Sequence, residues 1–218
     1  MHVVALDQTL RNIKIAQRFG DGVFLISHND RIDTTELAAI CQASRKQFRN
    51  FWIGANFLDR TNPAFAVRHA PLCCSGLWTD DSGISDIGVQ KVAVSFQETY
   101  ATGNWKGLYF GGVAHKGQAP VTDAAQAARN AVGLVDVITT TGPCTGVPPT
   151  VAKVRVMREA IGDFPLAIAS GMTAENVSRY KPYADCFLVG TSLEVGEGLC
   201  EFNPEKVKAM ADIIHRED

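Results

Sequence analysis

The sequence predicts an α/β fold: a single compact (β/α)8 TIM barrel with eight parallel strands, forming one domain over residues 1–218. Short apolar runs alternate with helical patterns, an order that favours right-handed crossovers and a parallel sheet. Eight such units of about 27 residues fill the chain, close to the lower size limit of this barrel. The first run ends in Asp7-Gln8-Thr9, without the glycine-rich turn of an open dinucleotide-binding sheet, which is the alternative fold.

Eight apolar runs bounded by polar or turn-forming residues are expected as the strands. In chain order they are Val3–Leu6, Gly22–Ile26, Phe51–Ala55, Ser75–Trp78, Gly107–Val113, Val135–Thr140, Pro165–Ala169 and Cys186–Val189. The three tryptophans of the chain are expected to pack against these strands rather than to stack on a ligand.

The segments between the runs carry helical periodicity and capping residues. Apolar residues recur every three or four positions in Gln8–Phe19, and again from Thr34 to Phe48. The later helices are expected over Val89–Tyr100, after a cap at Thr122 or Asp123, over Thr150–Ile161, after a cap at Thr173, and after Asn203 with Pro204 in the first turn.

Composition excludes several classes of protein. Hydrophobic residues make up 46% of the chain and charged residues 20%, the balance of a globular protein. The formal net charge of −2 offers no basic excess for a nucleic-acid backbone. No apolar run approaches the roughly 20 residues that cross a bilayer. The six cysteines are scattered without metal-knuckle spacing, so we expect free thiols, a cytoplasmic location and no metal centre built from cysteine.

Reactive groups of a barrel gather at the carboxyl ends of its strands. The sequence places polar or glycine residues at each of these ends. In strand order they are Asp7, His28, Asn56, Asp80 with Asp81, Lys116, Thr141 with Gly142, Thr145 and Gly146, then Ser170 with Gly171, and Gly190 with Thr191 and Ser192. The Thr141, Gly142, Thr145 and Gly146 positions are expected to contact substrate.

The last two strand ends predict a phosphate site. Glycine lets backbone approach a ligand closely, and free N–H groups near a helix start favour an anion. Barrels often bind phosphate in the loops after strands seven and eight. The expected phosphate-binding residues are Ser170, Gly171, Met172, Gly190, Thr191 and Ser192. The alternative is that these glycines only permit tight turns.

Lys116 is the first candidate for catalysis. A lysine at a strand end can be desolvated, which lowers its pKa and frees the amine for Schiff-base or acid–base work. It can equally be a fixed cation that grips a phosphate or carboxylate. The third alternative is an ordinary solvated loop lysine.

The other catalytic candidates are a set of acids, an amide and a histidine. Asp80 or Asp81 can act as a general base, or the pair can hold Mg²⁺ with a substrate phosphate; otherwise Asp-Asp-Ser-Gly is a turn. No other cofactor is expected. Asn56 can orient substrate or brace the barrel. His28 titrates near neutral pH but can be structural. Asp7 is a possible base or a helix N-cap.

Several stretches resemble the BtpA/SgcQ family. They are Thr141–Pro149, Ala169–Val177, Tyr183–Asp185, Val189–Leu193 and Asn203–Val207, with weaker traces at Ile53–Asn56 and Thr79–Gly83. The resemblance is strongest over residues 105–215. It implies a TIM barrel related to ribulose-phosphate-binding barrels, whose members are labelled phosphoribosylanthranilate-isomerase-like or photosystem I biogenesis factors.

The chain also departs from the family pattern. The family usually has an extended N-terminal segment, whereas here the first strand is expected almost at Met1. After strand five the family tends to read Asp-Val-His-Val-Lys-His, and this chain reads Gly112-Val113-Ala114-His115-Lys116-Gly117. Lys116 is retained. His115 is shifted by one position and is therefore expected to point to the opposite face of an extended strand.

Two functions follow from these residues. The first is an isomerase, lyase or transferase acting on a small phosphorylated metabolite, such as a sugar phosphate or a nucleotide-derived compound. The loops after strands seven and eight would hold the anion. The alternative is a non-catalytic barrel, either a ligand-binding subunit or an assembly factor. Whether the barrels pair into a homo-oligomer stays open.

Overall fold

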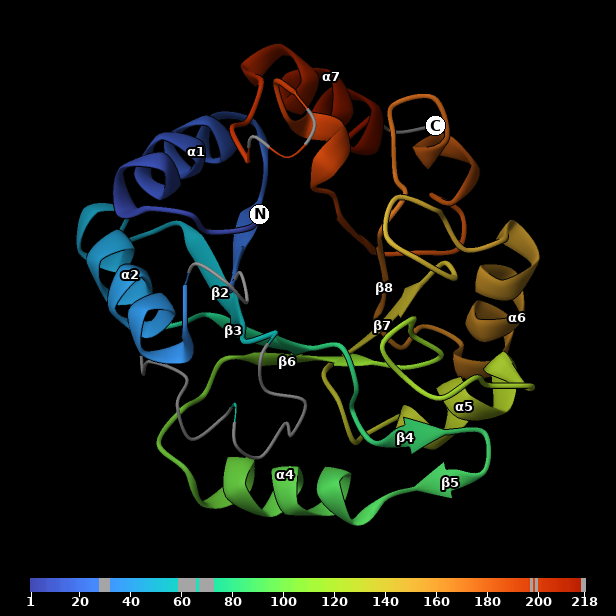
Figure 1. The fold of residues 1–218 in the computed structure, drawn as a ribbon. Helices are drawn as coiled ribbons and strands as arrows, with labels where there is room; N and C mark the ends of the chain where they lie inside the picture. The colour runs from blue at the N-terminus through green and yellow to red at the C-terminus, as the bar shows by residue number, and fades with distance from the viewer. Residues whose placement is uncertain (28–31, 59–65, 67–72, 197, 199, 217–218) are drawn as a thin grey trace.

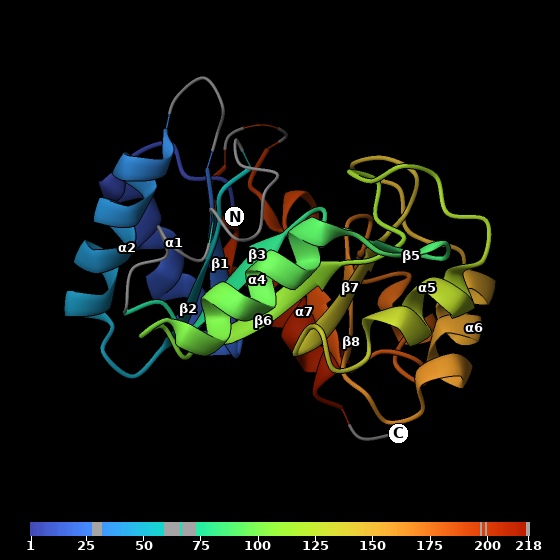
Figure 2. The ribbon, with the colours of Figure 1, turned by 90° about the horizontal axis from the view of Figure 1, so that it is seen from below.

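The computed structural model describes residues 1–27, 32–58, 66, 73–196, 198 and 200–216. Its core is a seven-stranded parallel sheet that curves into a nearly closed barrel, with the helices arranged outside the strands (Figure 1). The predicted α/β barrel is confirmed. Seen from the side, the long helices flank the strands along most of their length (Figure 2).

The strands follow the predicted apolar runs within two residues. They are β1 (Gly22–Ile26), β2 (Trp52–Asn56), β3 (Gly76–Thr79), β6 (Leu108–Gly112), β7 (Val137–Thr141), β8 (Leu166–Ala169) and β9 (Cys186–Leu188), hydrogen-bonded in that order. Parallel register places the carboxyl ends of neighbouring strands together, as where Asn56 pairs with Trp78 and Thr141 with Ala169. The loops that follow these strands therefore share one rim.

The N-terminal strand was predicted wrongly. Only a single bridge, from His2 to Ile26, represents the expected eighth strand beside β1. Val3 N–H donates to Ile26 O at 2.9 Å, but helix α1 already begins at Leu6. The apolar run is divided because Thr9 N–H donates to Ala5 O at 3.0 Å and so extends helical hydrogen bonding back to Ala5. The ladder therefore runs from this short segment and β1 around to β9.

The helices begin largely where their capping residues predict. They are α1 (Leu6–Phe19), α2 (Thr34–Gln47), α4 (Lys91–Thr102), α5 (Ala124–Ala131), α6 (Val151–Ile161) and α7 (Pro204–Ile214). Side chains at Asp123, Thr150 and Asn203 accept hydrogen bonds from the first turns of α5, α6 and α7.

Two helix predictions need correction. The helix expected after Thr173 is instead a turn followed by the 3₁₀ segment η1 (Val177–Arg179). In the turn, Asn176 N–H and Val177 N–H both donate hydrogen bonds to Thr173 O. The helix expected from Val89 begins at Lys91, because Val89 belongs to an antiparallel hairpin of β4 (Ile84–Ser85) and β5 (Gly88–Val89).

The core has two parts. The larger part packs between strands and helices, where Ile53, Leu77 and Ile138 are fully buried. The smaller part fills the barrel interior with Phe24, Phe110, Val137 and Ala167, against which Trp52 and Trp78 pack. Small residues make room for these rings: a Cβ at Gly54 would lie 2.5 Å from Phe24 Cε1, and one at Gly76 would lie 2.4 Å from Trp52 Cζ2. Aromatic rings therefore fill much of the interior.

Candidate functional site

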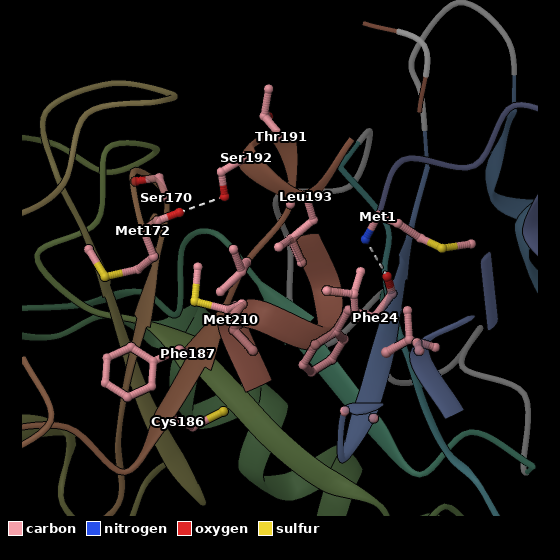
Figure 3. Close-up of a pocket in the computed structure, with 18 of the residues that line it drawn as sticks. Met1, Phe24, Ser170, Met172, Cys186, Phe187, Thr191, Ser192, Leu193 and Met210 are labelled. Atoms are coloured by element: carbon pink, nitrogen blue, oxygen red, sulfur yellow. Dashed lines mark hydrogen bonds between the residues drawn. The ribbon is translucent and has the colours of Figure 1, made fainter. Parts of the chain in front are cut away.

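A cavity of about 790 Å³ opens beside β9 and reaches into the barrel. Its walls come from β9, the 3₁₀ segment η2 (Thr191–Leu193) and α7 on one side, and from residues 1–2 and β1 on the other. In Figure 3 the hydroxyl-bearing residues Ser170, Thr191 and Ser192 lie at one end, while Phe187 and Cys186 lie at the opposite end. The cavity thus has a polar mouth and an apolar interior.

The six residues expected to bind phosphate all border this cavity: Ser170, Gly171, Met172, Gly190, Thr191 and Ser192. The two loops that carry them are joined, because the Ser192 hydroxyl donates to Met172 O at 2.7 Å (Figure 3). Parallel strands bring the loops after β8 and β9 to the same rim, as the sequence predicted. Their role in binding phosphate stays a prediction.

The two glycines of these loops have different structural roles. Gly171 has a φ of 70°, and a Cβ there would lie 2.1 Å from Pro148 N, so glycine is needed for contact with the preceding loop. A Cβ at Gly190 would meet no heavy atom within 4 Å among the described residues. Tight packing therefore explains Gly171, whereas Gly190 leaves open space beside the cavity.

Lys116 lies at the same rim, on the loop after β6. Its Nζ donates to Thr145 Oγ1 at 2.7 Å, and its backbone N–H donates to Thr141 Oγ1 at 2.8 Å. Lys116, Thr145 and Gly146 border the cavity. Thr141 is fully buried, and a Cβ at Gly142 would lie 2.1 Å from Val147 O. Two of the four expected substrate residues thus face the cavity, and the other two shape the loop.

Asp80 and Asn56 meet at the ends of β3 and β2. The Asn56 amide donates to Asp80 Oδ1 at 3.1 Å. His115 joins them from the loop after β6, with its Nε2 3.9 Å from the same oxygen. These three polar side chains come from three neighbouring strand ends. Only Asn56 and Asp80 were candidates on sequence grounds.

His115 points inward, against the expectation from strand alternation. The strand ends at Gly112 and Ala114 adopts a φ of 49°, so alternation no longer applies at His115. Its ring lies edge-on to Trp78, 6.2 Å between centroids, and is 4% exposed. Gly117 N–H donates to Nδ1 at 3.1 Å, which leaves the proton of the neutral ring on Nε2. Burial lowers the pKa of His115 to about 4, opposed by nearby Asp80.

The remaining candidates lie elsewhere. Asp81 makes a turn, since its Oδ1 accepts from Gly83 N and from the Gln118 amide, both at 2.8 Å. Asp7 does not end a strand or cap a helix: it is exposed in the first turn of α1, whose N-cap is Ala5. His28 lies outside the described residues. Catalytic roles for these residues stay predictions.

Lys153 is a feature that the sequence analysis missed. From the first turn of α6, its Nζ donates to Ala114 O at 2.5 Å and to Thr141 O at 2.8 Å. Burial lowers the pKa of this amine to about 8. Lys153 therefore ties together the loops after β6 and β7, which carry Lys116 and Thr145. The sequence offered one sign of this role, which is that Lys153 lies three residues after the helix cap at Thr150 and so near the rim at which α6 begins.

In the described ranges, no three His, Cys, Asp or Glu side chains cluster in a way that could hold a metal ion. Magnesium at Asp80 and Asp81 stays a prediction. Among the described helices, none has the length and apolarity that a membrane crossing requires.

The parallel barrel, with polar loops at the carboxyl ends of its strands, defines a TIM-barrel protein. Solved structures share this fold. Phosphoribosyl anthranilate isomerase from Thermus thermophilus is 12% identical, with a TM-score of 0.61 over 97% of this chain and 94% of that one. Orotidine 5'-phosphate decarboxylase from Pyrococcus horikoshii is 13% identical, with a TM-score of 0.64 over 100% of both chains.

A sequence profile of the BtpA family matches residues 74–216, and the chain belongs to that family. No curated protein matches the chain. The tryptophan synthase alpha chain from Legionella pneumophila is a further similar structure, 15% identical with a TM-score of 0.63 over 98% of this chain and 89% of that one. At these identities the solved structures establish the fold alone.

Proposed function

We propose that this BtpA-family barrel binds a small phosphorylated metabolite at its rim and acts on it as an isomerase, lyase or transferase. One observation carries the proposal: a single cavity is bordered by both glycine-containing loops and by Lys116. Loops after the last two barrel strands are a common phosphate site in this fold. Two similar structures, the isomerase and the decarboxylase, bear names that include phosphorylated compounds.

Anion binding would draw on hydrogen bonds and charge. The hydroxyls of Ser170 and Thr191 border the cavity, and the open space at Gly190 would allow an oxygen to approach backbone. Lys116 provides the cation, held over the cavity by Thr145. Lys116 is exposed, so its attraction to a phosphate would act in a high dielectric and would be weaker than that of a buried ion pair.

Proton transfer would fall to Asp80. Its side chain is 28% exposed, and Asn56 donates to one of its oxygens, which fixes the orientation of the carboxylate. Asp80 does not border the cavity, so its free lone pairs would take a proton from a ligand that extends beyond the mouth toward the end of β3. Lys116 would stabilise the negative charge that develops as the proton leaves. Lys153 would hold the supporting loops in place.

A thermal-shift series tests the binding step. Ribose 5-phosphate, glycerol phosphate and inorganic phosphate are added to the wild type, to Gly190→Asp and to the control Ser178→Asp. Ser178 is exposed on η1 and does not border the cavity, so the control adds the same charge elsewhere. Stabilisation that is lost only in Gly190→Asp supports the proposal. No response to any phosphate, with a stably co-purifying protein, supports the non-catalytic assembly factor instead.

The role of Lys116 needs a separate test once a substrate is turned over. Lys116→Met removes the cation and keeps an unbranched side chain that is one atom shorter. We expect a fall in kcat/KM of at least about tenfold, since charge-assisted hydrogen bonds are worth about 1.5–3 kcal/mol. Unchanged turnover would remove Lys116 from the mechanism.

A further inference from the structure

We infer that the interior of the cavity binds an apolar, ring-bearing group of the ligand, so that the substrate class is a phosphate ester of an apolar alcohol. The inference rests on the proposed phosphate site at the rim and extends it inward. Sugar phosphates would fill the mouth alone. An ester with an aromatic or hydrocarbon group would fill the mouth and the interior together.

The inner wall on the strand side is aromatic. Phe24, Trp52, Trp78 and Phe110 all border the cavity and come from β1, β2, β3 and β6. The ring centroids of Phe24 and Trp52 lie 4.9 Å apart, and those of Phe24 and Phe110 lie 5.0 Å apart. Such a wall offers ring faces and edges to an aromatic guest and little to a polyhydroxylated one.

The opposite wall is aliphatic and sulfur-containing. Met172, Leu193 and Met210 surround the cavity between its mouth and its inner end (Figure 3). Methionine is unbranched and polarizable, so it adapts to apolar groups of differing shape. Together with the aromatic wall, these side chains enclose the inner cavity on both sides.

The cavity exists because the barrel ladder ends at β9. The hydrogen-bonded order runs from β1 to β9, and the cavity lies between β9 and the N-terminal segment beside β1. It continues past the barrel interior to Asp21 and His215, which are joined by a 3.0 Å contact at the far end. At about 790 Å³ it falls within the roughly 300–1,000 Å³ of pockets that enclose small organic ligands.

Calorimetric titration of the full chain with inorganic phosphate, 1-naphthyl phosphate and 1-naphthol tests the inference. We expect the ester to bind at least about tenfold more tightly than inorganic phosphate, since burying apolar area is favourable. Cys186→Phe and Ala211→Phe each add a ring to the cavity wall, from β9 and from α7. Ala101→Phe adds the same ring to an exposed position on α4 that does not border the cavity.

The outcomes separate the two proposals. The inference holds if either filling variant loses the advantage of the ester while keeping its affinity for inorganic phosphate, and Ala101→Phe keeps both. Equal affinities for the ester and for inorganic phosphate would overturn it and leave the rim phosphate site standing. Binding of 1-naphthol with no gain from the phosphate would uphold the apolar site and overturn the rim site. Should one filling variant fail to fold, the other carries the comparison.

Discussion

Gly171 and Gly190 provide a matched pair in which the same substitution to alanine should destabilise the protein at the first position and leave its stability nearly unchanged at the second. In Gly171→Ala the residue must adopt a φ of 70°, and its Cβ must lie 2.1 Å from Pro148 N and 2.4 Å from Val147 C. The left-handed conformation costs about 1–2 kcal/mol, and forcing backbone apart in a packed region costs about 1–3 kcal/mol more. We therefore expect Gly171→Ala to lose about 2–5 kcal/mol of unfolding free energy.

Gly190→Ala incurs neither the cost of a positive φ nor the cost of a close contact. Its φ is −133°, and no heavy atom of the described residues lies within 4 Å of the new Cβ. Its unfolding free energy should stay within about 1 kcal/mol of the wild type. Urea denaturation followed by circular dichroism measures both variants at equal m-values. A Gly171→Ala variant as stable as Gly190→Ala would refute the assignment of Gly171 to loop packing.

Two further predictions concern the pH dependence of stability. The pKa of His115 is about 4 in the folded protein, against an ordinary value of 6.5. As the pH falls between these values, the unfolded chain therefore binds a proton that the folded protein does not, and this lowers the unfolding free energy. From pH 7 to pH 4.5 the wild type should lose more unfolding free energy than His115→Gln. Equal losses of unfolding free energy in the wild type and in His115→Gln, measured by urea denaturation, would contradict this. Hydrogen bonds from Thr122 and Asp123 lower the pKa of Asp86 to about 2 in the folded protein. The wild type should therefore have a higher unfolding free energy than Asp86→Asn, with the full difference above about pH 4 and a smaller difference toward pH 2. A difference that does not change with pH would contradict this role of Asp86.

The sequence predicted most features that depend on local or repeating patterns. The caps at Asp123, Thr150 and Asn203 were predictable because each accepts from a backbone N–H two or three residues later in the chain. The meeting of Ser192 with Met172 followed from parallel topology, since consecutive strand ends share a rim.

Other features depended on tertiary geometry that no local pattern carries. His115 turns inward because Ala114 leaves the extended region, and a non-glycine residue gives little sign of this in the sequence. The hydrogen bonds that the Lys153 amine donates to Ala114 O and Thr141 O depend on the path of two loops. Trp52 and Trp78 do pack against strands, as expected, but they also line a cavity that arises only because the ladder ends at β9.

A crystal structure grown in phosphate tests the central claim most directly. The account predicts a phosphate ion at the mouth of the cavity, accepting hydrogen bonds from the loops of residues 170–172 and 190–192 and lying within reach of the Lys116 amine. Phosphate bound elsewhere on the barrel, with this mouth holding only water at saturating phosphate, would contradict it.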